Sequence, residues 1–159
     1  MILTTRHTIL LCSLLAICLA TSGWAAGLRG TFSGDDELII EERWPGYMET
    51  PSGLRYIVEK EGTGDKPLRG MKISVLYTAF LMDGTQFNEA LDPEHPFQFK
   101  LGGGDVIKGW EEAFSDMRKG EIRILLIPHE LGYGLRGNGE RIPRRSALVF
   151  RVEIIDIEG

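Results

Sequence analysis

The sequence predicts an α+β fold, in which a strongly twisted antiparallel β-sheet of five to six strands wraps around one short amphipathic α-helix. Two observations lead to this prediction. Several segments alternate apolar and polar residues with the period of two that strands show, and only one segment has apolar residues at steps of three and four. The 159 residues are 43% hydrophobic and 26% charged, which is ordinary for one folded domain.

The predicted strands begin at Leu54 and run almost to the end of the chain. The clearest signal is a hairpin, because the alternating segment 71–82 ends at Asp83-Gly84, a strong turn pair, and 85–87 would return. The other predicted strands are 54–60, 97–99, 121–127 and 146–157.

The single predicted helix follows a glycine-rich stretch and starts near residue 105. Asp105 is its expected N-cap, and Lys119-Gly120 its expected stop. Its apolar face consists of Val106, Trp110, Ala113, Phe114 and Met117. The 18 residues 128–145 contain four glycines and no periodic pattern, and a loop of this length is usually functional or mobile.

Residues 1–25 are predicted to be a signal peptide. A weakly positive start precedes an apolar run at 9–20, and small residues suit cleavage after Ala25, with Ala20 and Ala26 as alternatives. The run is shorter than the about 20 residues of a membrane span, and Ile17 is too large to precede a lipidated cysteine. A membrane anchor and a lipoprotein are therefore disfavoured, and we expect no stable anchor after cleavage.

Residues 26–50 differ in composition from the rest of the chain. They are acidic, contain glycine, and carry two short apolar islands at 38–40 and 44–48. We interpret them as an N-terminal extension or tether with one docked turn, and a solvated linker is an equal alternative. The remaining residues, 51–159, would form the domain.

The composition excludes several classes of function. A net charge of −5 argues against nucleic-acid binding, and three histidines and two cysteines argue against a dedicated metal site or cofactor. The glycine-rich segment 101–109 lacks the spacing of a phosphate-binding loop. What remains is a set of aromatic and aliphatic residues. Most of such a set is ordinarily core, so those at the ends of elements are the better site candidates: Phe87, Val106, Ile107 and Tyr133.

Several separated motifs resemble FKBP-type peptidyl-prolyl cis-trans isomerases. They read VLYTAFLMDGTQF, PFQFKLGGGDVIKGWEEAFSDMRKGE, IPHELGYG and IPRRSALVFRVEII. The resemblance covers about residues 51–158, in the family's order, and the family's fold agrees with the one predicted above. It implies an enzyme that accelerates rotation about Xaa-Pro bonds without a cofactor or metal, acting on proline-containing polypeptides and binding macrolide immunosuppressants.

The resemblance also implies a set of site residues. Trp110 would form the floor of an apolar pocket, and Phe87 would lie beside the proline ring. The Ile107 N–H and the Tyr133 hydroxyl would donate hydrogen bonds to substrate carbonyls. The implied catalytic residues are Tyr77, Phe87, Asn88, Ile107, Tyr133 and Phe150. The implied substrate-binding residues are Phe97, Val106, Trp110 and Ile142.

The chain departs from the family pattern in a polar corner of this site. Asn88 stands where the family has aspartate, and Pro93 where its arginine partner often lies. We expect Asn88 to accept a hydrogen bond from Tyr77 without a negative charge. Asn138 and Arg141 replace a histidine and an apolar residue, so we expect substrate preference to differ.

Two functions remain open at this point. The first is an exported prolyl isomerase that assists protein folding, in a bacterial periplasm or, as an alternative, secreted. The second is a weakly catalytic chaperone or partner-binding module on the same fold. We expect a monomer in either case.

Overall fold

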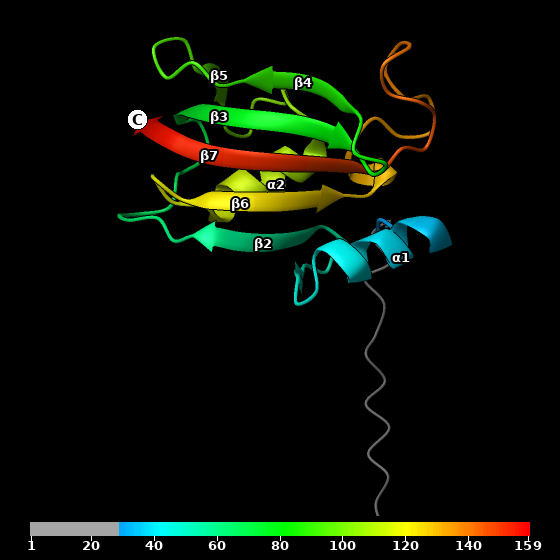
Figure 1. The fold of residues 1–159 in the computed structure, drawn as a ribbon. Coiled ribbons are helices and arrows are strands. Elements are labelled where there is room, and N and C mark those ends of the chain that lie inside the picture. The colour runs from blue at the N-terminus through cyan, green and yellow to red at the C-terminus, as the bar shows by residue number, and fades with distance from the viewer. Residues whose placement is uncertain (1–28) are drawn as a thin grey trace, which may run out of the picture.

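The computed structural model describes residues 29–159, so the predicted signal peptide lies outside the described residues. Figure 1 shows a curved sheet with one helix behind it and a second beside the start of the first long strand. The elements in chain order are α1 (Gly34–Arg43), β1 (Met48–Glu49), β2 (Arg55–Lys60), β3 (Lys72–Leu81), β4 (Gln86–Ala90), β5 (Phe97–Lys100), α2 (Lys108–Asp116), β6 (Ile122–Ile127), the 3₁₀ turn η1 (His129–Leu131) and β7 (Leu148–Glu158).

The sheet is antiparallel throughout, with the order β1-β2-β6-β7-β3-β4 and with β5 paired to β3. The predicted α+β class is confirmed, and all six predicted strand segments form strands. The count of five to six strands is corrected to seven within residues 29–159. The additional strand, β1, has two residues, which is too short to produce an alternating pattern.

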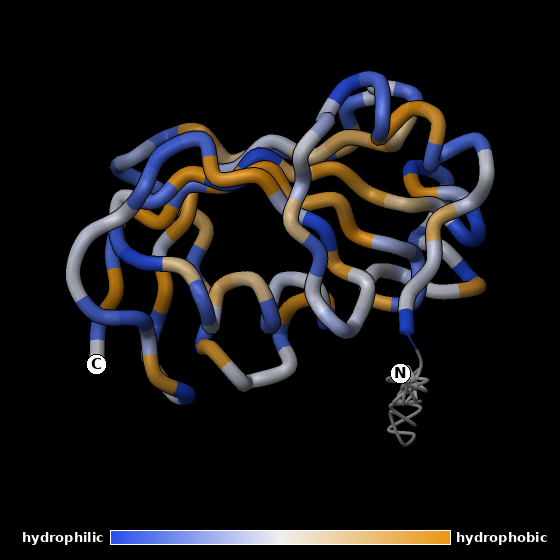
Figure 2. The backbone as a smooth tube through the Cα atoms, turned by 90° about the horizontal axis from the view of Figure 1, so that it is seen from below, coloured by the Kyte–Doolittle hydropathy of each residue, from blue (hydrophilic) through white to orange (hydrophobic). Residues whose placement is uncertain are grey.

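The main core lies between the sheet and α2. Leu125, Ile127 and Phe150 belong to the cluster around α2, whereas Leu126 and Val149 belong to a second cluster with α1. Successive side chains in a strand point to opposite faces, so β6 and β7 supply both clusters at once. Figure 2 shows hydrophobic stretches along the strands and hydrophilic residues in the loops.

The described part of segment 26–50 forms a helix that docks on the sheet, which is more structure than the one docked turn that was expected. Helix α1 begins after a capping box, in which the Ser33 hydroxyl accepts the Asp36 N–H and the Asp36 carboxylate accepts the Ser33 N–H. Ile40 is fully buried against the second face of the sheet. It is the one buried residue of α1, so the helix has no broad apolar face that the sequence could reveal.

Arg55 fastens this N-terminal segment to the sheet. Its guanidinium donates two hydrogen bonds to the Glu37 carboxylate, at 2.6 and 2.9 Å, and its Nε donates to Glu49 at 2.8 Å. The same group lies over the rings of Phe32 and Tyr47, 4.7 and 4.5 Å from their centroids. Within residues 29–159 neither helix is long and apolar enough to cross a membrane.

Helix α2 is capped differently from the prediction. It begins at Lys108, its N-cap is Ile107 rather than Asp105, and no side chain caps it. It ends at Asp116, before the expected stop at Lys119-Gly120. The carboxylate of Glu111, one turn inside the helix, accepts the N–H groups of Gly102 and Gly104 at 2.6 and 2.9 Å. This contact, rather than a cap, holds the glycine-rich loop against the helix.

Candidate active site

An aromatic pocket of about 300 Å³ opens between the sheet and the start of α2, and nine of the ten predicted site residues line it. They are Tyr77, Phe87, Asn88, Phe97, Val106, Ile107, Trp110, Tyr133 and Phe150. Asp105 also lines this aromatic pocket, and sequence reasoning missed it by assigning it to the helix cap. Its position directly before Val106 and Ile107 was the available signal.

Ile142 is the predicted residue that does not line the aromatic pocket. It is buried, 4% exposed, in the main core, and it lines a neighbouring cavity of about 420 Å³. That cavity shares Phe87, Asn88 and Tyr133 with the aromatic pocket. Ile142 therefore borders the neighbouring cavity rather than the aromatic pocket.

Trp110 forms the floor of the aromatic pocket, at 4% exposure. Tyr77 and Phe150 approach its indole edge-on, with ring centroids 5.0 and 5.2 Å away. Phe97 packs on it in the same manner at 5.8 Å. The indole Nε1 is buried without a hydrogen-bond partner among residues 29–159. The floor is therefore an apolar surface that forms no polar contact with the rest of the described chain.

A β-bulge places two consecutive residues on the same wall. In the register of β3 with β4, Ala79 pairs with Asn88 and Phe80 with Gln86, so Phe87 is left unpaired between them. Consecutive strand residues ordinarily point to opposite faces, and a bulge breaks that alternation. Phe87 and Asn88 both line the aromatic pocket for this reason.

Two groups at the pocket can donate hydrogen bonds to a ligand, the backbone N–H of Ile107 and the hydroxyl of Tyr133. The Ile107 carbonyl accepts the N–H groups of Trp110 and Glu111, at 3.0 and 3.1 Å, whereas its own N–H donates to no backbone group among the described residues. Tyr133 is 36% exposed at the rim of the pocket. Burial raises the pKa of Tyr77, and the nearby Tyr133 adds to that increase, so the Tyr77 hydroxyl is neutral at physiological pH.

The interaction expected between the Tyr77 and Asn88 side chains is present but falls short of ordinary hydrogen-bond geometry. The Asn88 amide lies close enough to Tyr77 to oppose the increase in the Tyr77 pKa. However, Asn88 Oδ1 accepts the backbone N–H of Glu89 at 2.9 Å, and the hydrogen bonds of residues 29–159 include none from Tyr77 to Asn88. The register explains the difference, because Tyr77 pairs with Ala90 and Asn88 is its diagonal neighbour on β4.

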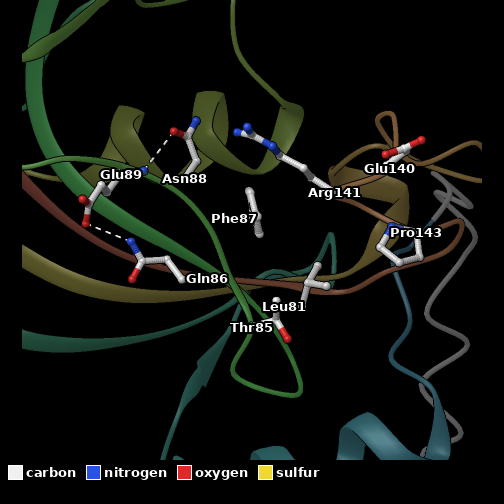
Figure 3. Close-up of a pocket in the computed structure, with 9 residues that line it drawn as sticks. All are labelled: Leu81, Thr85, Gln86, Phe87, Asn88, Glu89, Glu140, Arg141 and Pro143. Atoms are coloured by element: carbon white, nitrogen blue, oxygen red, sulfur yellow. Dashed lines mark hydrogen bonds between the residues drawn. The ribbon is translucent and has the colours of Figure 1, made fainter.

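A larger cavity of about 610 Å³ shares Phe87 and Asn88 with the aromatic pocket and is shown in Figure 3. Its lining residues are Leu81, Thr85, Gln86, Phe87, Asn88, Glu89, Glu140, Arg141 and Pro143. Arg141 extends across Phe87 and directs its guanidinium toward the amide of Asn88. In the part of the chain that the structure describes, no group of three or more His, Cys, Asp or Glu side chains is arranged to hold a metal ion.

Comparisons with known proteins identify the class of this fold and pocket. The sequence model of the FKBP-type peptidyl-prolyl cis-trans isomerases matches residues 64–155, which is more than half of the chain. The chain belongs to this family and is a peptidyl-prolyl cis-trans isomerase. The resemblance of the sequence motifs to the family is thereby confirmed.

Individual relatives support the assignment. An FK506-binding protein of Neisseria meningitidis serogroup A is 45% identical over 98 residues, which are 62% of this chain and 90% of that protein. The mouse peptidyl-prolyl cis-trans isomerase FKBP2 is 48% identical over 95 residues, 58% of this chain and 68% of that protein.

Solved structures show the same fold. FkpA from Escherichia coli matches 78% of this chain with a TM-score of 0.68 and 35% identity, and this chain covers 56% of FkpA. AtFKBP13 matches 71% of this chain with a TM-score of 0.66 and 33% identity, and 98% of that chain is covered.

Proposed function

We propose that this protein accelerates cis-trans isomerisation of Xaa-Pro bonds in exported polypeptides by stabilising the twisted amide, without covalent chemistry, in the aromatic pocket. One observation supports this most strongly. The pocket combines a buried indole floor, five further aromatic side chains and donors at its rim. A proline ring is apolar, and the peptide groups on either side of it carry carbonyl oxygens. The apolar surface and the donors of the pocket therefore match the two parts of this substrate.

The physical basis is the loss of amide resonance during rotation. The planar amide is separated from its isomer by a barrier of about 18–20 kcal/mol. The twisted amide is less dipolar than the planar one, so an apolar pocket that excludes water binds it better than the ground state. An enzyme that binds the transition state more tightly than the substrate accelerates the reaction. No proton transfer is needed.

The residues would divide this work between them. Trp110 would carry the proline ring, Phe87 would pack beside it, and Tyr77 and Phe150 would complete the aromatic wall. The Tyr133 hydroxyl would hold the carbonyl of the residue before the proline, and the Ile107 N–H would hold a second substrate carbonyl.

A protease-coupled assay on a proline tetrapeptide tests this function. Tyr133→Phe should lower kcat/KM several-fold, because one neutral hydrogen bond contributes about 0.5–1.5 kcal/mol. Tyr47→Phe is the matched control, because it removes a hydroxyl that donates to Glu41 on the other face of the sheet. Its kcat/KM should equal that of the wild type. Equal values for all three proteins would remove Tyr133 from the site.

The alternative is a weakly catalytic chaperone or partner-binding module. The favouring observation is that large apolar side chains remain exposed at the pocket and in the loop beside it: Phe97, Tyr133 and Leu135. An aggregation assay on an unfolded client, run beside the peptide assay, separates the two functions. Suppressed aggregation with negligible isomerisation would favour the alternative.

We also propose export and macrolide binding. Export rests on the composition of residues 1–25, and a periplasm is favoured because the chain without this segment has no cysteine and needs no disulfide. Mass spectrometry of the mature N-terminus in cell fractions tests it. The Neisseria relatives named FK506-binding proteins support inhibition by FK506-type macrolides. We propose a monomer, which sedimentation would test.

A further inference from the structure

Two cavities adjoin the aromatic pocket and share one wall, which carries Arg141. They measure about 610 and 420 Å³, and both are lined by Phe87, Asn88, Glu140 and Arg141. We refer to them together as the Arg141 cleft. Because Phe87 and Asn88 also line the aromatic pocket, a peptide bound there would have its neighbouring residues at the entrance of the Arg141 cleft.

The guanidinium of Arg141 has no anionic partner within residues 29–159. The hydrogen bonds and ion pairs of these residues include none from Arg141. Two carboxylates line the cleft. Glu89 accepts the Gln86 amide at 2.8 Å and lies on the far side of Asn88, whereas the carboxylate of Glu140 lies at the opposite end of the Arg141 side chain from its guanidinium. Arg141 thus presents an exposed, unpaired cation over Phe87.

The loop that carries Arg141 is positive in an otherwise acidic chain. Residues 128–146 contain four arginines and two glutamates, while the whole chain has a net charge of −5. One of these arginines, Arg144, donates its Nε to the Leu135 carbonyl at 3.1 Å and so helps to hold the loop. The unpaired Arg141 guanidinium in this loop attracts a ligand group of negative charge.

We infer that the Arg141 cleft binds an acidic side chain at the position that precedes the proline, so that this isomerase prefers Glu-Pro and Asp-Pro bonds. The inference rests on the proposed function, in which Tyr133 holds the carbonyl of that preceding residue. Tyr133 lines both the aromatic pocket and the Arg141 cleft. A residue whose carbonyl is held by Tyr133 therefore has its side chain within reach of the cleft, where a guanidinium can bind a carboxylate through two hydrogen bonds.

Three tetrapeptides that differ only in having Glu, Gln or Lys before the proline test this inference at low ionic strength. We expect kcat/KM for the Glu peptide to exceed that for the Gln peptide about two- to fivefold, the range of a partly exposed ion pair. The Lys peptide should be slower than the Gln peptide. Added salt should reduce the ratio of Glu to Gln, because salt screens exposed charges.

Variants assign the preference to one residue. Arg141→Gln should bring the Glu:Gln ratio close to one, and Arg141→Glu should invert it. Arg151→Gln is the matched control, since Arg151 is an exposed arginine on β7, outside the cleft, that pairs with Glu59 on β2. Its Glu:Gln ratio should equal that of the wild type.

The outcomes separate the inference from the function on which it rests. Failure to isomerise any of the three peptides would refute the proposed function. Isomerisation with equal kcat/KM for Glu and Gln would overturn the inference alone, as would a preference that persists in Arg141→Gln.

Discussion

Tyr77 and Trp110 meet edge to face, with ring centroids 5.0 Å apart and planes at 84°. The contact joins the middle of β3 to the first turn of α2 and closes the bottom of the aromatic pocket. Phe114, one turn further along α2, also packs on the indole, with ring centroids 5.1 Å apart, and is fully buried. The pocket floor is thus also the top layer of the core.

Substitutions at these two helix positions separate the pocket from the core. Trp110→Ala and Phe114→Ala should each lower the free energy of unfolding by about 3–5 kcal/mol. Only Trp110→Ala should also lower kcat/KM of the folded protein. Trp110→Leu should keep the fold and lose less than about tenfold in kcat/KM, because Nε1 has no partner to lose and the floor needs only an apolar surface. Urea unfolding and the peptide assay measure both quantities, and a folded but inactive Trp110→Leu would contradict a passive floor.

Asn88→Asp tests the polar corner. Asn88 is exposed and faces the Arg141 guanidinium, so a carboxylate here needs little desolvation and finds a cation that Pro93 cannot supply. We expect the free energy of unfolding to change by less than about 1 kcal/mol. The preference for Glu over Gln before the proline should shrink, because the new carboxylate competes for Arg141.

A double-mutant cycle checks the assignment of this effect. The double variant Arg141→Gln/Asn88→Asp should have the same Glu:Gln ratio as Arg141→Gln alone. An equal change in both backgrounds would show that Asn88 acts independently of Arg141.

Arg55→Met tests the attachment of α1. The variant keeps an apolar stem between Phe32 and Tyr47 but loses the charged hydrogen bonds to Glu37 and Glu49. We expect the free energy of unfolding to fall by about 1.5–3 kcal/mol and residues 29–49 to become more sensitive to limited proteolysis.

The control for this change is Arg151→Met, which breaks an exposed pair and should cost under about 1 kcal/mol. Since α1 packs on the face of the sheet opposite α2, both variants should keep the kcat/KM of the wild type. Equal stability of the two variants would contradict a fastening role for Arg55.

Asp116→Asn tests a pH-dependent contribution to stability. Partial burial opposes ionisation of Asp116, but hydrogen bonds from Lys66 and Arg123 outweigh it and lower the pKa of the carboxyl. A carboxyl whose pKa is lowered by folding stabilises the protein above its unfolded pKa of about 3.9, and this stabilisation is lost as the pH falls through the folded value.

Asp116→Asn should therefore be less stable than the wild type at pH 7, by about 0.5–1 kcal/mol because the group is half exposed. The difference should vanish in acid. Asp65→Asn, at an exposed position without an ion pair among the described residues, is the control and should show no such pH-dependent loss. A difference between wild type and Asp116→Asn that is the same at pH 7 and pH 3 would contradict the linkage.

The strands and α2 could be read from the sequence because their patterns are long and bury one face. Residues 72–81 alternate over ten positions, and the apolar residues of 108–116 repeat at helical spacing. Helix α1 could not be read in this way, since it buries only Ile40, and its one local signal was the Ser33–Asp36 capping pair. The cap of α2 was misassigned because Glu111, inside the helix, holds the preceding loop instead of Asp105.

The sequence by itself determined the fold class, the order of the main elements and the family, because hydrophobic periodicity and turn pairs act over short stretches of chain. Only the tertiary structure decided which groups meet across long separations. It placed Phe87 and Asn88 on one wall through the bulge in β4, placed Ile142 in the lining of the neighbouring cavity, and directed Arg141 toward Asn88. Strand register and loop closure set these contacts, and both depend on the packing of the whole domain rather than on local pattern.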